Sequence, residues 1–275
     1  MDILKRLLEI FETKMEIPKQ FGWFHLMFWG ITIASAVLLC VTDKNKDPDR
    51  ARRVVLIMSI ITIVLEIYKQ TVFTFSVTDG KIVADFAWYV FPFQFCSMPM
   101  YIGLLAGLTR RGRLHDACCA FLATYSLFAG LCVMIYPGDV FCGLLGINIQ
   151  TMIWHGSMVS IGAYLLYSGH VKLRHKTILG AIAVFAACIV CAMILNEVVY
   201  YTVPLDGDTF NMFYISRHFP GTLPVYSSVQ KVVPYPFCVI IYIAAFSVVA
   251  YVILLAAMGI RKLYSNIARK ADIIE

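Results

Sequence analysis

The stretch Phe91-Pro-Phe-Gln-Phe-Cys-Ser-Met-Pro-Met100 lies inside a long apolar run and carries Gln94, Cys96 and Ser97 between two prolines. Hydrocarbon tolerates a distorted, polar stretch of helix only where protein or trapped water surrounds it. The sequence therefore predicts that this stretch forms the inner wall of a polar pocket. Cys96 is the most reactive group in that wall.

The composition around this stretch is that of a polytopic membrane protein. Of the 275 residues, 60% are hydrophobic and 15% are charged, whereas a soluble domain has about 25% charged residues. The mean hydropathy is +0.77. The net charge of +6 does not indicate a nucleic-acid partner, because the basic residues lie between apolar runs, where membrane topology explains them. No cleavable signal peptide is visible, so we expect the first span to direct insertion.

The nine cysteines do not indicate a disulfide framework, since most of them fall in apolar runs, where cysteine is usually a small packing residue. Cys188-Ile-Val-Cys191 has the spacing of a redox or zinc motif but lacks flanking ligands. The sequence contains no glycine-rich phosphate loop and no zinc signature. It therefore predicts no metal and no organic cofactor.

Seven apolar runs have about the 20 residues that a transmembrane helix needs: 24–41, 55–73, 86–107, 117–136, 148–169, 178–203 and 235–259. The predicted fold is an all-α bundle of seven transmembrane helices over residues 21–262. An amphipathic segment, 1–20, precedes it and a cytoplasmic tail, 263–275, follows. Residues 3–12 have helical apolar spacing, which fits a helix on the membrane surface and equally a helix packed on the bundle.

The basic residues predict the orientation of the bundle. The connections after the first, third and fifth runs, together with the C-terminal tail, hold 15 of the 23 lysines and arginines. The opposite side holds 7, and Lys69 lies within the second run. The positive-inside rule then places the N-terminus outside and the C-terminus in the cytoplasm.

With this orientation, polar residues gather in the outer half of the bundle. At about 1.5 Å per residue, Gln94 and Cys96 lie about 12–15 Å below the outer end of their helix, and His155 lies about 10 Å deep. Buried polar groups are costly unless they meet one another or water, so we expect a cavity opening to the outer face. The other members of this group are Glu66, Lys69, Gln70, Gln150, Thr151, Asn196, Glu197, Asn211, Tyr214, Arg217 and His218.

Cys96 and His155 are the candidate nucleophile and base, because a buried thiol needs a neighbouring imidazole to become a thiolate. The alternative is a packing cysteine near a histidine that bonds a carbonyl. Gln94 and Asn196 are candidate donors to an oxyanion.

The charged residues of the outer half carry two further hypotheses. Glu66, Lys69 and Glu197 form either a relay or ion-pair site or a structural salt bridge. Arg217 and His218, with Lys231, either hold a phosphate or carboxylate or belong to a solvated loop. The four tryptophans, Trp23, Trp29, Trp88 and Trp154, have the positions of interfacial anchors.

A series of short motifs resembles the YwaF-like bacterial membrane proteins, which are similar to the transmembrane protein 164 acyltransferase family. The resemblance runs from about residue 25 to 258, and the order and spacing of the motifs carry it. They are Phe-Pro-Phe-Gln-Phe-Cys-Ser-Met (91–98), Ile-Gln-Thr-Met-Ile-Trp-His-Gly (149–156), Asn196, Asn211-Met-Phe-Tyr214 and Pro234-Tyr-Pro-Phe237.

The resemblance implies an acyltransferase that acts on phospholipids, with Cys96 as its cysteine and His155 as its helix-5 histidine. It also implies a bacterial plasma membrane. The chain departs from the bacterial pattern at Gln94, where that pattern has histidine, so either Cys96 acts without that partner or the site has lost a polar group. It departs again at Arg217-His218-Phe-Pro220, which replaces a shorter Lys-Pro stretch.

Three functions follow from these observations. The leading one is a phospholipid acyltransferase working through a thioester at Cys96. The second is a transporter or small-molecule binding protein that uses Glu66, Lys69 and Glu197, and the third is a structural membrane protein with an inert polar cluster. The expected partners are membrane lipids, without nucleic acid, and a homo-oligomer remains an option.

Overall fold

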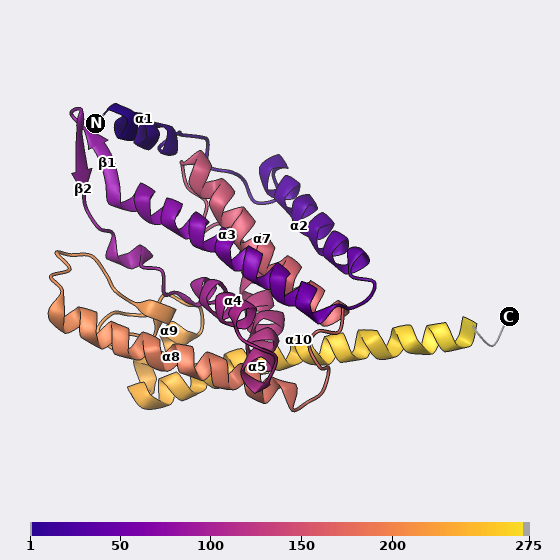
Figure 1. The fold of residues 1–275 in the computed structure, drawn as a ribbon. Coiled ribbons are helices and arrows are strands. Elements are labelled where there is room, and N and C mark those ends of the chain that lie inside the picture. The colour runs from indigo at the N-terminus through magenta and orange to yellow at the C-terminus, as the bar shows by residue number, and fades with distance from the viewer. Residues whose placement is uncertain (1, 272–275) are drawn as a thin grey trace.

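The structure is a computed structural model that describes residues 2–271, with side chains for residues 3–267. Residues 272–275 of the expected tail, and the side chains of Arg269 and Lys270, lie outside the described part. The helices and strands are α1 (Asp2–Phe11), α2 (Trp23–Thr42), α3 (Pro48–Thr74), β1 (Phe75–Thr78), β2 (Lys81–Ala84), η1 (Trp88–Val90), η2 (Phe95–Ser97), α4 (Met98–Leu108), α5 (Arg113–Phe121), η3 (Leu122–Ser126), α6 (Leu127–Ile135), α7 (Leu145–Tyr167), α8 (Thr177–Thr202), η4 (Met212–Tyr214), α9 (Tyr226–Val232) and α10 (Tyr235–Ala271) (Figure 1).

Four helical segments of the described chain are long and apolar enough to cross a membrane: α2, the continuous helix α5–η3–α6, α8, and α10 as far as Ile267. The outward faces of α2, α8 and α10 carry exposed aliphatic side chains, such as Ile33, Val190 and Val252, whereas α5–η3–α6 is mostly enclosed by protein. Side chains of this kind are stable when they face lipid. The prediction of an all-α integral membrane protein is confirmed.

α7 is the most enclosed helix and packs against α2, α3 and α6 (Figure 1). Its polar residues, including Asn148, Gln150 and His155, are almost fully buried. They make α7 less apolar than the lipid-facing helices. A helix surrounded by protein tolerates such residues because its neighbours, rather than hydrocarbon, receive them.

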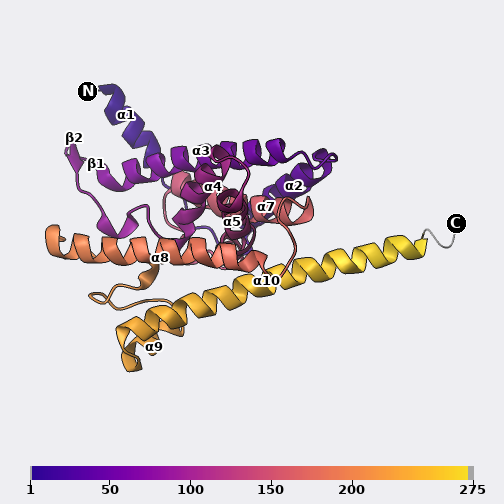
Figure 2. The ribbon, with the colours of Figure 1, turned by 60° about the horizontal axis from the view of Figure 1, so that its bottom comes forward.

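The remaining helices follow one another from α3 through α4, α5 and α8 to α10 (Figure 2). Two glycines allow the closest of these contacts. A Cβ atom on Gly103 of α4 would lie 2.2 Å from Ser59 Oγ of α3, and one on Gly107 would lie 2.6 Å from Leu56 Cβ. Small residues four positions apart let two membrane helices approach closely, so these glycines fix α4 against α3.

The prediction of one continuous helix over 86–107 is wrong. Residues 86–94 contain only the short turn η1, and regular helix starts at η2 and α4. Pro92 removes a backbone donor and disfavours helical geometry at Phe91, which has φ −48° and ψ 137°. Pro99 is compatible with helix because it stands in the first turn of α4. The predicted depth of about 12–15 Å for Gln94 and Cys96 assumed helical rise over the whole run. That depth is therefore wrong as well.

The chain reaches this non-helical stretch through a hairpin that the apolar pattern did not reveal. β1 pairs antiparallel with β2, and Asp79 and Gly80 connect them with positive φ angles of 50° and 72°. An Asp-Gly pair is the favoured connection of a two-residue hairpin. The hairpin therefore lies between α3 and the stretch at 91–97.

Candidate functional site

The stretch 91–97 packs on the loop before and within η4. Phe91 contacts Phe210 with ring centroids 5.3 Å apart, and Phe95 contacts Phe213 at 5.9 Å. Phe93 also approaches Phe213, at 6.2 Å. All three phenylalanines therefore pack on this loop, with Gln94 between Phe93 and Phe95 and Cys96 directly after them in η2.

Gln94 and Asn196 hold this loop by its backbone. The Gln94 amide accepts a hydrogen bond from Phe213 N at 2.9 Å and donates one to Asn211 O at 3.0 Å. From α8, the Asn196 amide accepts from Met212 N at 2.7 Å and donates to Met212 O at 3.1 Å. Each side chain therefore uses both its acceptor and a donor on residues 211–213, and we call these four bonds the amide clamp.

The turn that the clamp holds is strained. Phe213 and Tyr214 both have φ 59°, a left-handed conformation that costs energy in residues other than glycine. Asn211 adds a third side chain, since its Oδ1 accepts from Ser216 N at 2.8 Å. Two amides from distant parts of the sequence, Gln94 and Asn196, and the local amide of Asn211 therefore impose this conformation.

Cys96 lies at the start of the α4 segment and touches α7. The Trp154 indole donates to Cys96 O at 2.8 Å, and Cys96 packs beside the buried cluster of Met100, Trp154 and Met158. The side chain of Cys96 is half-buried. The contact brings the third and fifth apolar runs together at Cys96, as the hypothesis of a Cys96–His155 pair requires.

Trp154 itself was expected to be an interfacial anchor, and this prediction is wrong. Its side chain is 3% exposed and its indole nitrogen is used inside the bundle. Tryptophan at a span end is typical of the interface, but an indole N–H also serves as a buried donor. The hydrogen bond to Cys96 O explains the burial of Trp154.

His155, the next residue, has one ring nitrogen bonded and one without a partner. Its Nδ1 lies 2.7 Å from Thr151 O. A carbonyl only accepts, so Nδ1 carries a proton, and in the neutral ring the lone pair is on Nε2. Nε2 is buried and has no hydrogen-bond partner among the described residues. His155 thus keeps Nε2 unengaged and does not bond Cys96 Sγ in this conformation.

Glu66 and Lys69 form the ion pair that their spacing on α3 predicts, with Lys69 Nζ 2.8 Å from Glu66 Oε1. Gln70 donates to the same Glu66 oxygen and to Val90 O, both at 2.8 Å. The second bond ties α3 to the segment just before Phe91. Gln70 Oε1 is a further buried atom without a partner in the described chain.

Glu197 belongs to a different cluster. Its Oε2 lies 2.6 Å from Arg217 Nη2 and 3.1 Å from His218 Nε2, and the His218 ring stacks on Tyr200 with centroids 3.6 Å apart. Among the described residues, Glu197 therefore forms no ion pair with Lys69, which pairs with Glu66 instead. The structure also shows that Arg217 and His218 share one carboxylate.

A small cavity of about 30 Å³ lies beside Trp154 and Met100, between α3, α4 and α7. This volume holds about one water molecule. Three of its polar side chains, Ser59, Thr62 and Ser157, bond carbonyls of their own helices. Among the described residues, no group of three or more histidine, cysteine or carboxylate side chains is placed to hold a metal ion.

Sequence reasoning did not select Trp154, Thr151 or Gln70 for the parts they play around Cys96 and His155. Thr151 has a signal, since it lies four residues before His155 and so one turn away on the same helix. Gln70 has the same spacing from Glu66. Trp154 has none, because its partner is a backbone carbonyl 58 residues away in sequence.

Residues 19–256 of the chain match the TMEM164 family. No curated protein and no solved structure gives a significant match. The matched region includes the stretch at 91–97, α7, α8 and the clamped loop, and it covers most of the chain. The chain therefore belongs to the TMEM164 family and is an integral membrane protein of that family.

Proposed function

We propose that this protein is a membrane-embedded acyltransferase that acts on phospholipids through a thioester at Cys96. One observation carries the proposal. Trp154 binds the backbone of Cys96, and the adjacent His155 keeps a buried lone pair on Nε2. The resemblance to an acyltransferase family points to the same chemistry.

In the proposed first step, Cys96 Sγ attacks the carbonyl of an acyl ester and the ester C–O bond breaks. His155 Nε2 takes the thiol proton and gives it to the departing alkoxide, which leaves as a lysolipid hydroxyl. The acyl group remains on sulfur as a thioester. Since His155 does not bond Sγ here, the proton crosses through a bound water or after a rearrangement on lipid binding.

In the second step, the hydroxyl of an acceptor lipid attacks the thioester carbonyl. His155 takes the hydroxyl proton, the C–S bond breaks, and the proton returns to sulfur. The N–H of Gln94 that the clamp does not use is the proposed donor to the oxyanion. Arg217 and His218, which Glu197 holds at the outer loop, are proposed to bind the lipid phosphate.

The proposal includes the topology that the charges predict. Seven spans cross the membrane, with α3, α4 and α7 completing the set, the N-terminus outside and the C-terminus in the cytoplasm. The proposed location is a bacterial plasma membrane. Cys96 and His155 then work on lipid in the outer half of the bundle.

Intact mass spectrometry after incubation with mixed phospholipids tests the thioester. Wild type should gain one acyl mass that hydroxylamine removes, and Cys96→Ala should gain none. Cys132→Ala removes an exposed cysteine of α6 and serves as the matched control, so it should behave like wild type. An adduct that persists in Cys96→Ala, or unchanged lipid remodelling by that variant, would rule out the mechanism.

The second candidate is a transporter or small-molecule binding protein. The buried Glu66–Lys69 pair with the unpartnered Gln70 Oε1 favours it, because buried charges in membrane helices often mark ion or substrate sites. Glu197, its third expected residue, is engaged by Arg217 and His218 instead. Proteoliposome uptake that is lost in Glu66→Gln and kept in Cys96→Ala would support this function over the first.

A further inference from the structure

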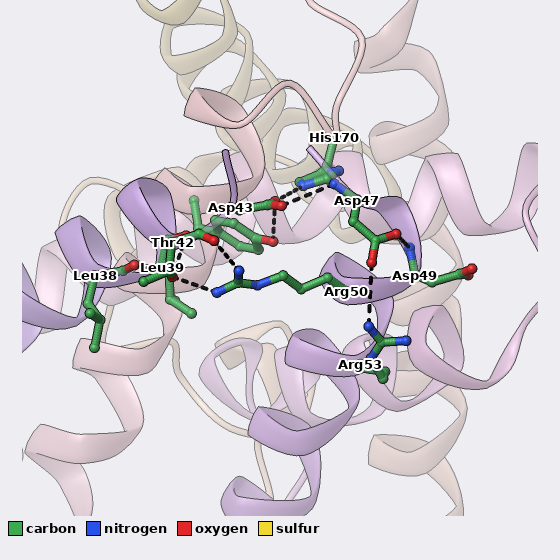
Figure 3. Close-up of polar contacts among 10 residues, drawn as sticks. Leu38, Leu39, Thr42, Asp43, Asp47, Asp49, Arg50, Arg53 and His170 are labelled. Atoms are coloured by element: carbon green, nitrogen blue, oxygen red, sulfur yellow. Dashed lines mark hydrogen bonds and ion pairs between the residues drawn. The ribbon is translucent and has the colours of Figure 1, made fainter. Parts of the chain in front are cut away.

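A second polar network lies at the ends of α2 and α7, outside the proposed site (Figure 3). Asp43 follows α2 and is 4% exposed. Its Oδ2 accepts from the Tyr164 hydroxyl at 2.7 Å and from His170 Nε2 at 2.6 Å, and its Oδ1 accepts from Asp47 N at 3.0 Å. The bond from Asp47 stays within the α2–α3 turn, and the other two run to α7 and to the connection after it, so Asp43 joins that turn to the end of α7.

This network sets the direction of the connection between α7 and α8. His170 turns inward to Asp43, and Val171 is 3% exposed, with its N–H bonded to Leu165 O at 3.2 Å. The residues that follow therefore turn outward. Lys172 and Arg174 are both exposed, on the side where α10 passes.

A groove of about 670 Å³ lies between this connection and α10. Four cations line it: Lys172 and Arg174 from the connection, and Arg261 and Lys262 from α10. One of them has a carboxylate partner, since Lys172 Nζ lies 2.9 Å from Asp116 Oδ2. Among the side chains of residues 3–267, no carboxylate pairs with the other three. The groove is therefore a cationic site with unused charge.

The groove also has an apolar part and borders the lipid-facing surface. Leu173 and Met258 line it beside the cations. Tyr167 and Tyr264, 74% and 73% exposed, flank these segments, as aromatic residues do at the level of lipid head groups. Cationic side chains directly beyond a membrane helix bind anionic head groups. A free phosphate would use the charges but not the apolar wall.

We infer that this groove binds the phosphate-bearing head group of an anionic phospholipid in the leaflet at this end of the bundle. The cations of the connection and of α10 hold the phosphate, and the apolar residues receive the start of an acyl chain. The site is independent of the proposed function, because it shares no residue with Cys96, His155 or the amide clamp.

Lipid binding to the full chain tests this inference. Native mass spectrometry would compare retention of phosphatidylglycerol and phosphatidylcholine, from vesicles of phosphatidylcholine alone and of both lipids. Wild type should retain phosphatidylglycerol preferentially. Replacing three cations (Arg174→Gln, Arg261→Gln, Lys262→Gln) should weaken that binding about a hundredfold, at about fivefold for each cation near the surface.

The matched control removes three exposed cations from other connections with the same predicted orientation: Lys44→Gln, Arg110→Gln and Arg111→Gln. It should retain phosphatidylglycerol as wild type does. Equal loss in both triple variants would show a general charge effect and overturn the site. If the triple variant does not fold, Arg261→Gln alone, at an exposed position of α10, should still lose about fivefold, and unchanged binding in it would overturn the site.

A second arm separates lipid from free phosphate. Inorganic phosphate is titrated into the detergent-solubilised protein while Tm is followed. The lipid site predicts that phosphate raises Tm little and that phosphatidylglycerol raises it clearly, in wild type and the control but not in the groove variant. An equal rise with inorganic phosphate, without lipid preference, would overturn the assignment to lipid.

Discussion

His170 and His155 both lie along or just beyond α7, and the protein uses their rings differently. His170 Nε2 bonds the buried carboxylate of Asp43, which also accepts hydrogen bonds from the Tyr164 hydroxyl and Asp47 N (Figure 3). His155 Nδ1 is bonded to the carbonyl one turn earlier, and its Nε2 has no partner in the described chain. One imidazole completes a network, and the other keeps a basic atom available.

The difference distinguishes a buried polar group that stabilises the fold from one that is available for chemistry. A buried polar atom without a partner costs about 1–3 kcal/mol, so a protein that retains one gains something elsewhere. The Asp43 network contains no such cost at its carboxylate and joins three chain segments. The region around Cys96 carries this cost at His155 Nε2 and at Gln70 Oε1.

The largest effect should come from the histidines themselves. His155→Gln removes the basic nitrogen, so acyl transfer should fall by about 10²–10⁴-fold with little change in Tm. His170→Gln should lower Tm and leave the activity of the folded protein unchanged. Lipid turnover and Tm measured on both variants check the contrast, and the reverse pattern would break the comparison.

The second largest effect should come from the Asp43 carboxylate, which accepts all three hydrogen bonds of its network. Asp43→Ala leaves His170 and Tyr164 without their acceptor inside the bundle, and breaking a buried pair costs about 3–5 kcal/mol. Tm in detergent should therefore drop strongly. Asp47→Ala is the control, because Asp47 is partly exposed and caps α3, and it should cost about 0.5–2 kcal/mol.

A smaller effect should follow loss of the amide clamp. Gln94→Leu removes the partners of Phe213 N and Asn211 O, at about 1–3 kcal/mol for each backbone group left buried without a partner. Hydrogen exchange should rise at residues 211–214. Gln20→Leu removes one exposed hydrogen bond, to Ile135 O. It should change neither the free energy of unfolding nor the hydrogen exchange at residues 211–214 appreciably. Unaltered exchange in Gln94→Leu would show that the clamp does not hold the turn.

The smallest effect is the acid dependence of the Asp43 network. Burial raises the pKa of Asp43, but the hydrogen bonds from His170, Tyr164 and Asp47 N outweigh it and leave the pKa below its usual value. The carboxylate therefore stabilises the fold above about pH 4, and this contribution is lost as pH falls through the lowered pKa. Tm of wild type should fall by a few degrees more than Tm of Asp43→Asn in that acid range.

The sequence predicts those features that depend on local spacing. The apolar runs locate most helix ends to within a few residues, but α3 begins seven residues before its run and α10 continues twelve residues past its run. At 86–107, Pro92 interrupts the helix. The three-residue spacing of Glu66 and Lys69 predicts their ion pair.

Other features depend on partners that local spacing does not specify. The amide clamp joins Gln94 to residues 211 and 213, more than a hundred positions away. Glu197 of α8 pairs with Arg217 and His218 rather than with Lys69, because the chain after α8 folds back over it. A free nitrogen on His155 is visible only when all its neighbours are placed.

α10 is longer than the hydrocarbon layer of a membrane is thick. At about 1.5 Å per residue, its 37 residues extend about 55 Å, against about 30 Å for the hydrocarbon layer. In both overall views its C-terminal end extends beyond the other helices (Figures 1 and 2). The described turns of α10 therefore continue past the rest of the bundle as one helix.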